Sequence, residues 1–339
     1  MLLVAVLDYP TNMQTKIFAV APMMDWTDRH CRVLHRLLSK HTRLYTEMIT
    51  ADAVLHGNRE RLLGFSGIEH PVALQLGGAD PGKLAEAARI ASEWGYDEIN
   101  LNAGCPSGRV QSGCFGAVLM RTPDLAYRCV AAMRAAAPVP VTVKCRIGVD
   151  DQEPHQALPV FVGACVAAGV TMFAVHARKA WLSGLSPAEN REIPPLDYDL
   201  VYRLKGAHPE LTIVINGGVG SLDEAGIHFN HVDGVMLGRA VYQNPAILAD
   251  VDRRFFDGAA GDVNDAVRQY TDYIAERLRD GVPLNPMTKH MLGLFQGRRG
   301  ARLFRRHLSE HTGRKEAGLS VLLDALALLE QQSVSAAAA

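Results

Sequence analysis

Eight short β-rich segments recur along the first 240 residues, and each is followed by a loop and an amphipathic stretch. They are residues 17–23, 43–49, 71–77, 98–104, 140–148, 172–178, 212–218 and 234–240. Stretches between them, such as 81–95 and 123–137, carry apolar residues at helical spacing. Strands that alternate with helices predict parallel βαβ units. Eight such units favour a closed TIM (β/α)8 barrel over an open doubly wound sheet.

The pattern changes after residue 250. Residues 263–281, 285–297, 300–313 and 316–331 all read as helices, with Gly281, Gly297, Gly300 and Gly313 at their breaks. We therefore predict an α/β chain with a TIM-barrel domain over residues 1–250. A small C-terminal helical domain over 251–331 and a disordered tail over 332–339 are expected to follow.

Composition narrows the class of protein. Of 339 residues, 48% are apolar and 21% are charged, which is typical of a soluble globular protein. The six cysteines show no zinc-ligand spacing, and no run of eighteen apolar residues suggests a membrane span. Asp8 interrupts the apolar N-terminus, which lacks a basic leader. We expect a cytoplasmic monomer with reduced thiols and no bound metal.

Polar residues gather at the predicted strand ends. The carboxyl ends of barrel strands form the face on which TIM-barrel chemistry occurs. The residues found at these ends are Pro22, Met23, Glu47, Gln75, Asn100, Asn102, Cys105, Lys144, Arg146, His176, Arg178, Asn216 and Arg239. Each polar residue alone has a structural explanation. Together they predict a ligand site, because unpaired polar groups inside a barrel mouth are costly.

The last two strand ends indicate a phosphorylated ligand. Asn216-Gly217-Gly218 and Gly238-Arg239 offer unobstructed backbone N–H groups at the corner where many barrels bind phosphate. Arg239 can add a charge-assisted contact. FMN fits the remaining groups, since Lys144 can stabilise the negative charge of a reduced flavin. A Schiff-base aldolase would also use a strand-end lysine, but it explains Cys105 less readily.

Gln75 and His176 complete the expected flavin contacts. Gln75 offers a donor and an acceptor to the polar edge of the flavin ring. His176 can serve the same edge or the phosphate side of the cofactor.

Cys105 follows the fourth predicted strand directly. A free cysteine thiol is mostly protonated at neutral pH and can deliver a proton. Reduction of a C=C bond conjugated to a carbonyl requires such a proton on the carbon opposite the hydride. No partner at metal-ligand spacing lies near Cys105. A small buried cysteine that only fills space is the competing interpretation.

The motifs as a whole resemble those of the tRNA-dihydrouridine synthases, and the bacterial A-type subgroup is the most similar. The segments that carry the resemblance are APMMDWTDRHCR (21–32), ALQLGG (73–78), INLNAGCPSGRVQSGCFGAVLM (99–120), VKCRIGVDD (143–151), VHARKAWLSGLSPAENREIPPLDYD (175–199), INGG (215–218) and MLGRAVYQNP (236–245). The resemblance implies a TIM barrel followed by a helical domain. It also implies an FMN-dependent enzyme that takes electrons from NADPH or NADH. Its expected reaction is reduction of the C5=C6 bond of uridine in the tRNA D-loop, at U20 and U20a.

Roles are implied for individual residues as well. The positions expected to hold FMN are Pro22, Met23, Met24, Gln75, Lys144, His176, Asn216, Gly217, Gly218, Gly238 and Arg239. The resemblance makes Cys105 the general acid that protonates C5. It places Asn102 on the target uracil, and Arg178 near the uracil edge or the adjacent phosphate. Ser183 and Ser186 fall in a loop expected to contact tRNA.

A strongly basic stretch predicts where RNA binds. Residues 289–315 contain eight lysines and arginines against one acid, Glu310, whereas the whole chain has a net charge of −1. A solvated helix face is the ordinary interpretation of a charge run, but such asymmetry favours contact with a phosphate backbone. Arg298, Arg299 and Arg302 are the leading candidates. A second patch at the barrel mouth would comprise Arg178, Lys179 and Arg191, and the target base would be extruded into the barrel.

Two other functions compete with this prediction. A flavin barrel that reduces a free metabolite, in the manner of a dihydroorotate or enoate reductase, explains the barrel and Cys105 but not the basic helices. An RNA-binding module on a catalytically inactive barrel explains the basic helices but not the polar strand ends.

Overall fold

The computed structural model describes residues 16–108 and 113–337, and eight parallel strands form its central sheet. The strands are β1 Ile17–Val20, β2 Leu44–Thr50, β3 Val72–Gly77, β4 Glu98–Ala103, β5 Val141–Arg146, β6 Met172–His176, β7 Thr212–Asn216 and β8 Gly234–Leu237. They follow the order β1-β8-β7-β6-β5-β4-β3-β2. Backbone bonds from Val20 N to Arg43 O (3.0 Å) and from Arg43 N to Phe18 O (2.8 Å) join β1 to the start of β2. The predicted TIM barrel is confirmed.

The barrel interior is filled in part by apolar side chains of different sizes. One buried cluster comprises Ala19, Ala21, Tyr45, Ala73, Met172, Ala174, Val214 and Met236. Polar side chains from β3, β4 and β5 occupy one side of this interior. The outer faces of the strands pack against the surrounding helices in a larger apolar core.

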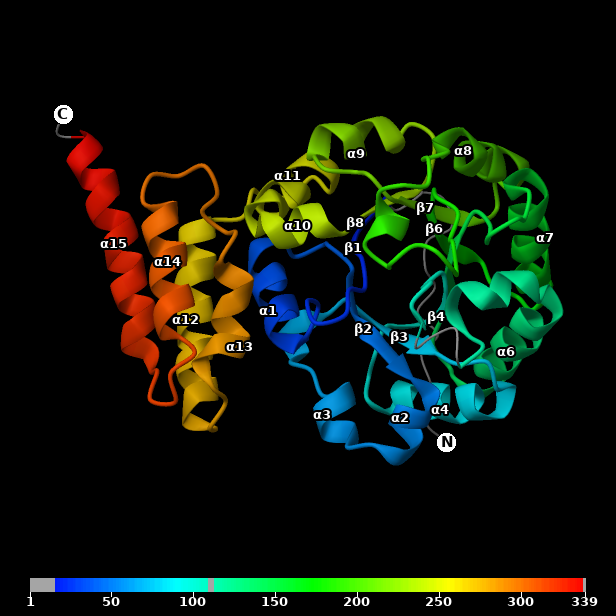
Figure 1. Cartoon of the computed structure of the whole chain (residues 1–339), viewed down its shortest axis with the longest axis horizontal. Helices are drawn as coiled ribbons and strands as arrows, with labels where there is room; N and C mark the ends of the chain where they lie inside the picture. The colour runs from blue at the N-terminus through cyan, green and yellow to red at the C-terminus, as the bar shows by residue number, and fades with distance from the viewer. Residues whose placement is uncertain (1–15, 109–112, 338–339) are drawn as a thin grey trace, which may run out of the picture.

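Helices surround the sheet, as Figure 1 shows. They are α1 Arg29–Leu38, α2 Ala51–His56, α3 Arg59–Leu63, α4 Pro81–Glu93, α6 Pro123–Ala136, α7 Pro154–Ala167, α8 Tyr198–Ala207, α9 Leu222–His228, α10 Arg239–Gln243 and α11 Val251–Phe255. Short 3-10 segments are η1 Gly67–Glu69, η2 Gly116–Arg121, η3 Glu189–Arg191 and η4 Pro245–Asp250. The starts of helices follow local rules. For α4, Pro81 occupies the first turn and the Asp80 side chain accepts a bond from Lys83 N (2.8 Å).

The C-terminal region is helical, as predicted. Its elements are α12 Val263–Arg279, α13 Leu284–Thr288, η5 Lys289–Met291, α14 Ala301–His311 and α15 Leu319–Ala337. The single helix expected over 285–297 is instead α13 followed by η5. Beyond η5, Gly293 packs closely on the backbone of Gln243, and only a glycine fits there because a Cβ would lie 1.9 Å from the Gln243 carbonyl oxygen.

The last helix, α15, extends to Ala337, within the segment 332–339 that was expected as a tail. Residues 338–339 and the first fifteen residues lie outside the described part of the chain.

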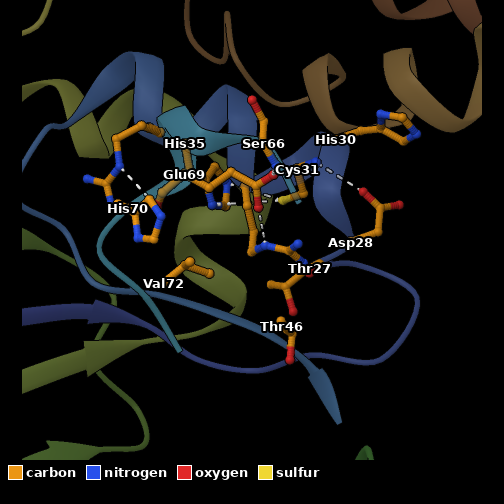
Figure 2. Close-up of polar contacts among 12 residues, drawn as sticks. Thr27, Asp28, His30, Cys31, His35, Thr46, Ser66, Glu69, His70 and Val72 are labelled. Carbon is orange, nitrogen blue, oxygen red and sulfur yellow. Dashed lines mark hydrogen bonds and ion pairs between the residues drawn. The ribbon is translucent and has the colours of Figure 1, made fainter. Parts of the chain in front are cut away.

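The helical region packs beside α1, α10 and α11 on one side of the barrel, with α15 outermost (Figure 1). Asp28 caps α1 by accepting a bond from Cys31 N (3.0 Å; Figure 2). The same carboxylate lies 2.9 Å from His290 Nε2 and 3.1 Å from Lys289 Nζ, both of η5. His30 Nδ1 is hydrogen-bonded to the Tyr273 hydroxyl of α12 at 2.7 Å. The helical region is thus joined to the barrel through polar contacts at the start of α1.

A buried ion pair joins α1 to η1. Glu69 of η1 accepts a bond from Arg32 Nε at 2.6 Å, and both side chains are almost fully buried. Among the described residues, no helix has the length and apolar character needed to traverse a bilayer.

Candidate active site

A cavity of about 1000 Å³ opens at the carboxyl ends of the strands. It is lined from β1 by Pro22, Met23, Met24 and Trp26, from β3 and β4 by Gln75, Asn102 and Cys105, from β5 and β6 by Lys144, Arg146 and His176, and from β7 and β8 by Asn216, Gly217, Gly218, Gly238 and Arg239. Arg191 of η3 also reaches it. The cavity therefore brings together every residue predicted to hold FMN, together with Cys105 and Asn102.

The loop after β4 aims Cys105 into this cavity. Asn102 Oδ1 accepts the backbone N–H of Gly104 (3.2 Å) and of Cys105 (3.0 Å), which folds the chain tightly at the strand end. A Cβ at Gly104 would lie 3.2 Å from the backbone of Cys145, so a glycine suits this close passage. The half-buried Cys105 thiol lies 3.5 Å from the Ser107 hydroxyl. The thiol is free and accessible from the cavity.

The cavity is strongly cationic. Lys144, Arg146, Arg191 and Arg239 line it, and Asp25 is the acid among the lining residues. Burial, and then the neighbouring Arg146, lower the pKa of Lys144 to about 8. Among the described residues, the Lys144 ammonium has no hydrogen-bond or ion-pair partner. A half-buried cation that lines a cavity without a partner indicates a ligand that carries negative charge or strong acceptor atoms.

His176 is the neutral member of this set. Burial lowers its pKa well below the usual value, and the nearby Arg146 and Lys144 lower it further. Gly217, with φ +107°, packs on its ring, and a Cβ there would lie 2.4 Å from His176 Cδ2. Glycine at this position gives both the required backbone conformation and room for the imidazole.

Two predicted arginines are engaged with the segment after β6. Arg239 forms an ion pair with Glu192 at the cavity rim. Arg178 does not line the cavity. Its Nη1 donates to the carbonyl oxygens of Glu192 (3.2 Å) and Pro194. These contacts tie the segment at 192–194 to the β6 and β8 strand ends.

The remaining mouth residues lie outside the cavity. Lys179 lines a separate pocket of about 290 Å³, and its ammonium lies 5.3 Å from the centre of the Trp181 ring. Ser186 is exposed, and its hydroxyl accepts the Glu189 backbone N–H at 3.2 Å. Ser183 is exposed on the same loop.

Some lining residues were not assigned a role from the sequence. Trp26 stacks on Tyr242 of α10 with ring centres 4.4 Å apart. Arg146 donates to the carbonyl oxygens of Gly104 (3.0 Å), Lys179 (3.0 Å) and Asn190 (2.9 Å), and so holds three loops around Cys105. The position of Arg146 at a strand end was a sequence signal that could have assigned it a role in the site. Trp26 carried none, because its approach to the cavity depends on the conformation of the loop after β1. Met48 carried none either, because it lies on β2 at a shift in strand register.

The basic stretch of the helical region is exposed and unpaired. The residues concerned are Arg298, Arg299, Arg302, Arg305, Arg306, Arg314 and Lys315. Within the described residues, none of these seven forms an ion pair, whereas Arg268 and Arg277 of α12 both do. We call these seven residues the basic surface. Unneutralised charge of one sign favours a polyanionic partner.

The described residues contain no group of three or more His, Cys, Asp or Glu side chains placed to hold a metal ion.

The fold and the site define a TIM-barrel protein with a cationic, thiol-containing cavity on its catalytic face and a basic helical extension. Residues 19–333 match the family model described as dihydrouridine synthase. The chain belongs to the dihydrouridine synthase family.

Curated relatives share most of its length. The chain is 56% identical over 315 residues to the tRNA-dihydrouridine(20/20a) synthase of Escherichia coli (strain K12), covering 92% of this chain and 91% of the relative. It is 55% identical over 315 residues to the protein of the same name in Xanthomonas axonopodis pv. citri, with 93% and 94% covered. For the Vibrio cholerae relative of that name the identity is 54% over 319 residues, with 93% and 97% covered.

Solved structures share the barrel at low sequence identity. Morphinone reductase aligns with a TM-score of 0.50 and 13% identity, covering 74% of this chain and 88% of that one. An old yellow enzyme homologue from Zymomonas mobilis aligns with a TM-score of 0.51 and 12% identity, covering 76% and 95%. At such identity the likeness concerns the fold alone.

Proposed function

We propose that this protein reduces uridine to 5,6-dihydrouridine in tRNA, at positions 20 and 20a of the D-loop. The observation that carries the proposal is the convergence of Cys105, Asn102, Lys144 and Gln75 in one cavity of a dihydrouridine synthase family member. The relatives named for this reaction at positions 20 and 20a are more than half identical to the chain.

FMN fits this cavity. Its volume, about 1000 Å³, lies at the upper end of the range for cofactor pockets. The unpartnered Lys144 would stabilise negative charge on the isoalloxazine ring. The Gly217–Gly218 and Gly238–Arg239 corners, with the first N–H groups of α10, would hold the phosphate. When bound and reduced by NADPH, the proposed reductant, FMN would supply the hydride for C6 of uracil.

The chain's own residues complete the reaction. Cys105 delivers the proton to C5 from its thiol, which becomes a thiolate. Arg146 and Lys144 lie close enough to Cys105 to interact electrostatically, and they would stabilise that thiolate. Asn102 anchors the Cys105 backbone and would orient the uracil. The protein therefore supplies the proton, the orientation and a cationic enclosure.

The basic surface supplies affinity for the tRNA. A uridine must leave the folded RNA to reach a cavity at the centre of the barrel, which costs unstacking energy. Backbone contacts by Arg298, Arg299 and Arg302, with Arg191 at the cavity mouth, would offset that cost. We also propose that the protein acts as a cytoplasmic monomer, in keeping with a substrate that is itself cytoplasmic.

The test uses purified protein with FMN, NADPH and an unmodified tRNA transcript. We expect a two-hydrogen mass increase in the fragment that contains positions 20 and 20a, and negligible reduction of free uridine. Comparable turnover of free uridine would instead favour a metabolite reductase. A protein that binds tRNA but takes up no FMN would favour the catalytically inactive module.

A further inference from the structure

A chain of buried side chains runs from the Cys105 loop into the barrel interior. Its members come from β3, β4 and β5, and each is 7% exposed or less. In order they are Asn102, Gln75, Asn100, Thr142 and Glu98. Glu98, Asn100 and Asn102 alternate along β4, so they share the strand face that points into the barrel. We call this set the amide relay.

Every hydrogen bond in the amide relay points the same way. Cys105 N donates to Asn102 Oδ1 (3.0 Å), and Asn102 Nδ2 donates to Gln75 Oε1 (2.9 Å). Gln75 Nε2 donates to Asn100 Oδ1 at 2.8 Å. Asn100 Nδ2 donates to Thr142 Oγ1 (2.8 Å), whose hydroxyl donates to Glu98 Oε1 (2.5 Å). The relay therefore ends on a carboxylate.

Both ends of the relay fix this direction. An ionised carboxylate only accepts, so Thr142 must donate to Glu98 and is left to accept from Asn100. At the other end, Asn102 Oδ1 accepts two backbone N–H groups, from Gly104 and Cys105. If the side-chain amides of Asn102, Gln75 and Asn100 all turned over, Asn102 Nδ2 would face the two backbone N–H donors in place of Oδ1. Buried donors without acceptors are costly, so no amide can invert alone or together with the others.

Glu98 has two further partners outside the relay. Arg43 Nη1 lies 2.7 Å from Oε2, and the Tyr45 hydroxyl donates to Oε1 at 2.8 Å. Burial and the Glu98 carboxylate raise the pKa of Tyr45 well above its usual value, so Tyr45 remains a donor. Glu98 does not line the cavity, so any influence on the ligand passes through the relay.

We propose that Glu98 is a positioning residue that makes Gln75 and Asn102 present N–H donors to the cavity. Each side-chain amide nitrogen carries two hydrogens, and the relay uses one of them. The second hydrogen on Gln75 and on Asn102 remains for a ligand, while Asn102 Oδ1 already accepts two bonds. At Asn102 the preferred ligand group is thus an acceptor, a carbonyl oxygen or an unprotonated nitrogen of a heteroaromatic ring, while Gln75 adds one N–H donor and keeps one lone pair on Oε1. The inference deepens the proposed function, on which the identity of that ring rests.

The test breaks the relay at Thr142. Thr142→Val removes the hydroxyl that links Asn100 to Glu98, and Thr142→Ser retains it. Tyr45→Phe is the matched control, because it removes a buried hydrogen bond from the same carboxylate outside the relay. The measurements are the FMN dissociation constant by flavin fluorescence, hydrogen exchange of the Gly104 and Cys105 amides, and the midpoint of thermal unfolding.

We expect Thr142→Val to weaken FMN binding by about tenfold and to speed exchange of both amides. The FMN affinities of Thr142→Ser and Tyr45→Phe should stay within about threefold of that of the unaltered protein. This should hold for Tyr45→Phe even if it lowers the midpoint of thermal unfolding as much as Thr142→Val does. Unchanged amide exchange in Thr142→Val would overturn the proposal. Equal loss of FMN affinity in Tyr45→Phe would do the same. If the unaltered protein takes up no FMN, the proposed function fails, and amide exchange still decides the role of Glu98.

Discussion

Cys105 is the residue on which the chemistry depends. Within the described residues, the one side-chain hydrogen bond of its thiol is a long one to the Ser107 hydroxyl, so Cys105→Ala should leave FMN binding intact. Without the proton donor, reduction of tRNA should fall by about 10²- to 10⁴-fold. Single-turnover kinetics with pre-reduced enzyme measure this step directly. Near-normal turnover in the variant would remove Cys105 from the mechanism.

Lys144 should make FMN binding depend on pH. Burial and Arg146 lower its pKa to about 8 in the free protein, so it carries its charge below that pH and loses it above. An electron-rich ligand prefers the charged form. FMN affinity should therefore fall as pH rises through 8, by up to about tenfold for each unit beyond it.

Lys144→Gln is the control for that titration. The variant should bind FMN more weakly at pH 7, with a flat profile between pH 7 and 9. Fluorescence titration at several pH values supplies both curves. A decline of the same size in the variant would assign the titration to another group.

At the scale of elements, Gly217 couples the β7 loop to His176 on β6. Gly217→Ala would impose an unfavourable backbone conformation and drive a methyl group into the imidazole. We expect a loss of about 1–3 kcal/mol in the free energy of unfolding, together with weaker FMN binding. Gly206→Ala in α8 is the control, since a Cβ there meets nothing within 4 Å. Urea unfolding of the two variants gives the comparison, and equal stabilities would contradict it.

The strands and their ends could be predicted from the sequence because each is a local pattern. A β-rich run followed by a turn places Gln75, Lys144 and His176 on one face as soon as the barrel is assumed. The close packing of Gly293 on Gln243 could not be predicted, because Gln243 lies fifty residues earlier in the chain. The amide relay also needed three strands in register. The alternation of Glu98, Asn100 and Asn102 along one strand was visible in the sequence. Their hydrogen-bond partners on the neighbouring strands, Gln75 and Thr142, could not be predicted from it.

At the scale of the whole molecule, the helical region contributes the exposed positive charge of the basic surface. Changing Arg298, Arg299 and Arg302 together to glutamine should weaken tRNA binding and reduce the slope of log affinity against log salt by about 2–3. The expected cause is the loss of three phosphate contacts. Arg268→Gln on α12 is the matched control, because Arg268 is already paired with Asp265. Filter binding across a salt series measures both, and an unchanged slope in the triple variant would place the RNA elsewhere.

The central claim is that this chain forms dihydrouridine in cellular tRNA by using Cys105. Mass spectrometry of tRNA from cells that lack the gene tests it most directly, with complementation by the unaltered protein or by Cys105→Ala. We predict that the two-hydrogen increment at positions 20 and 20a disappears on deletion, returns with the unaltered protein and stays absent or minor with the variant. An unchanged level of dihydrouridine at these positions in the deletion strain, or full restoration of dihydrouridine by Cys105→Ala, would contradict this claim.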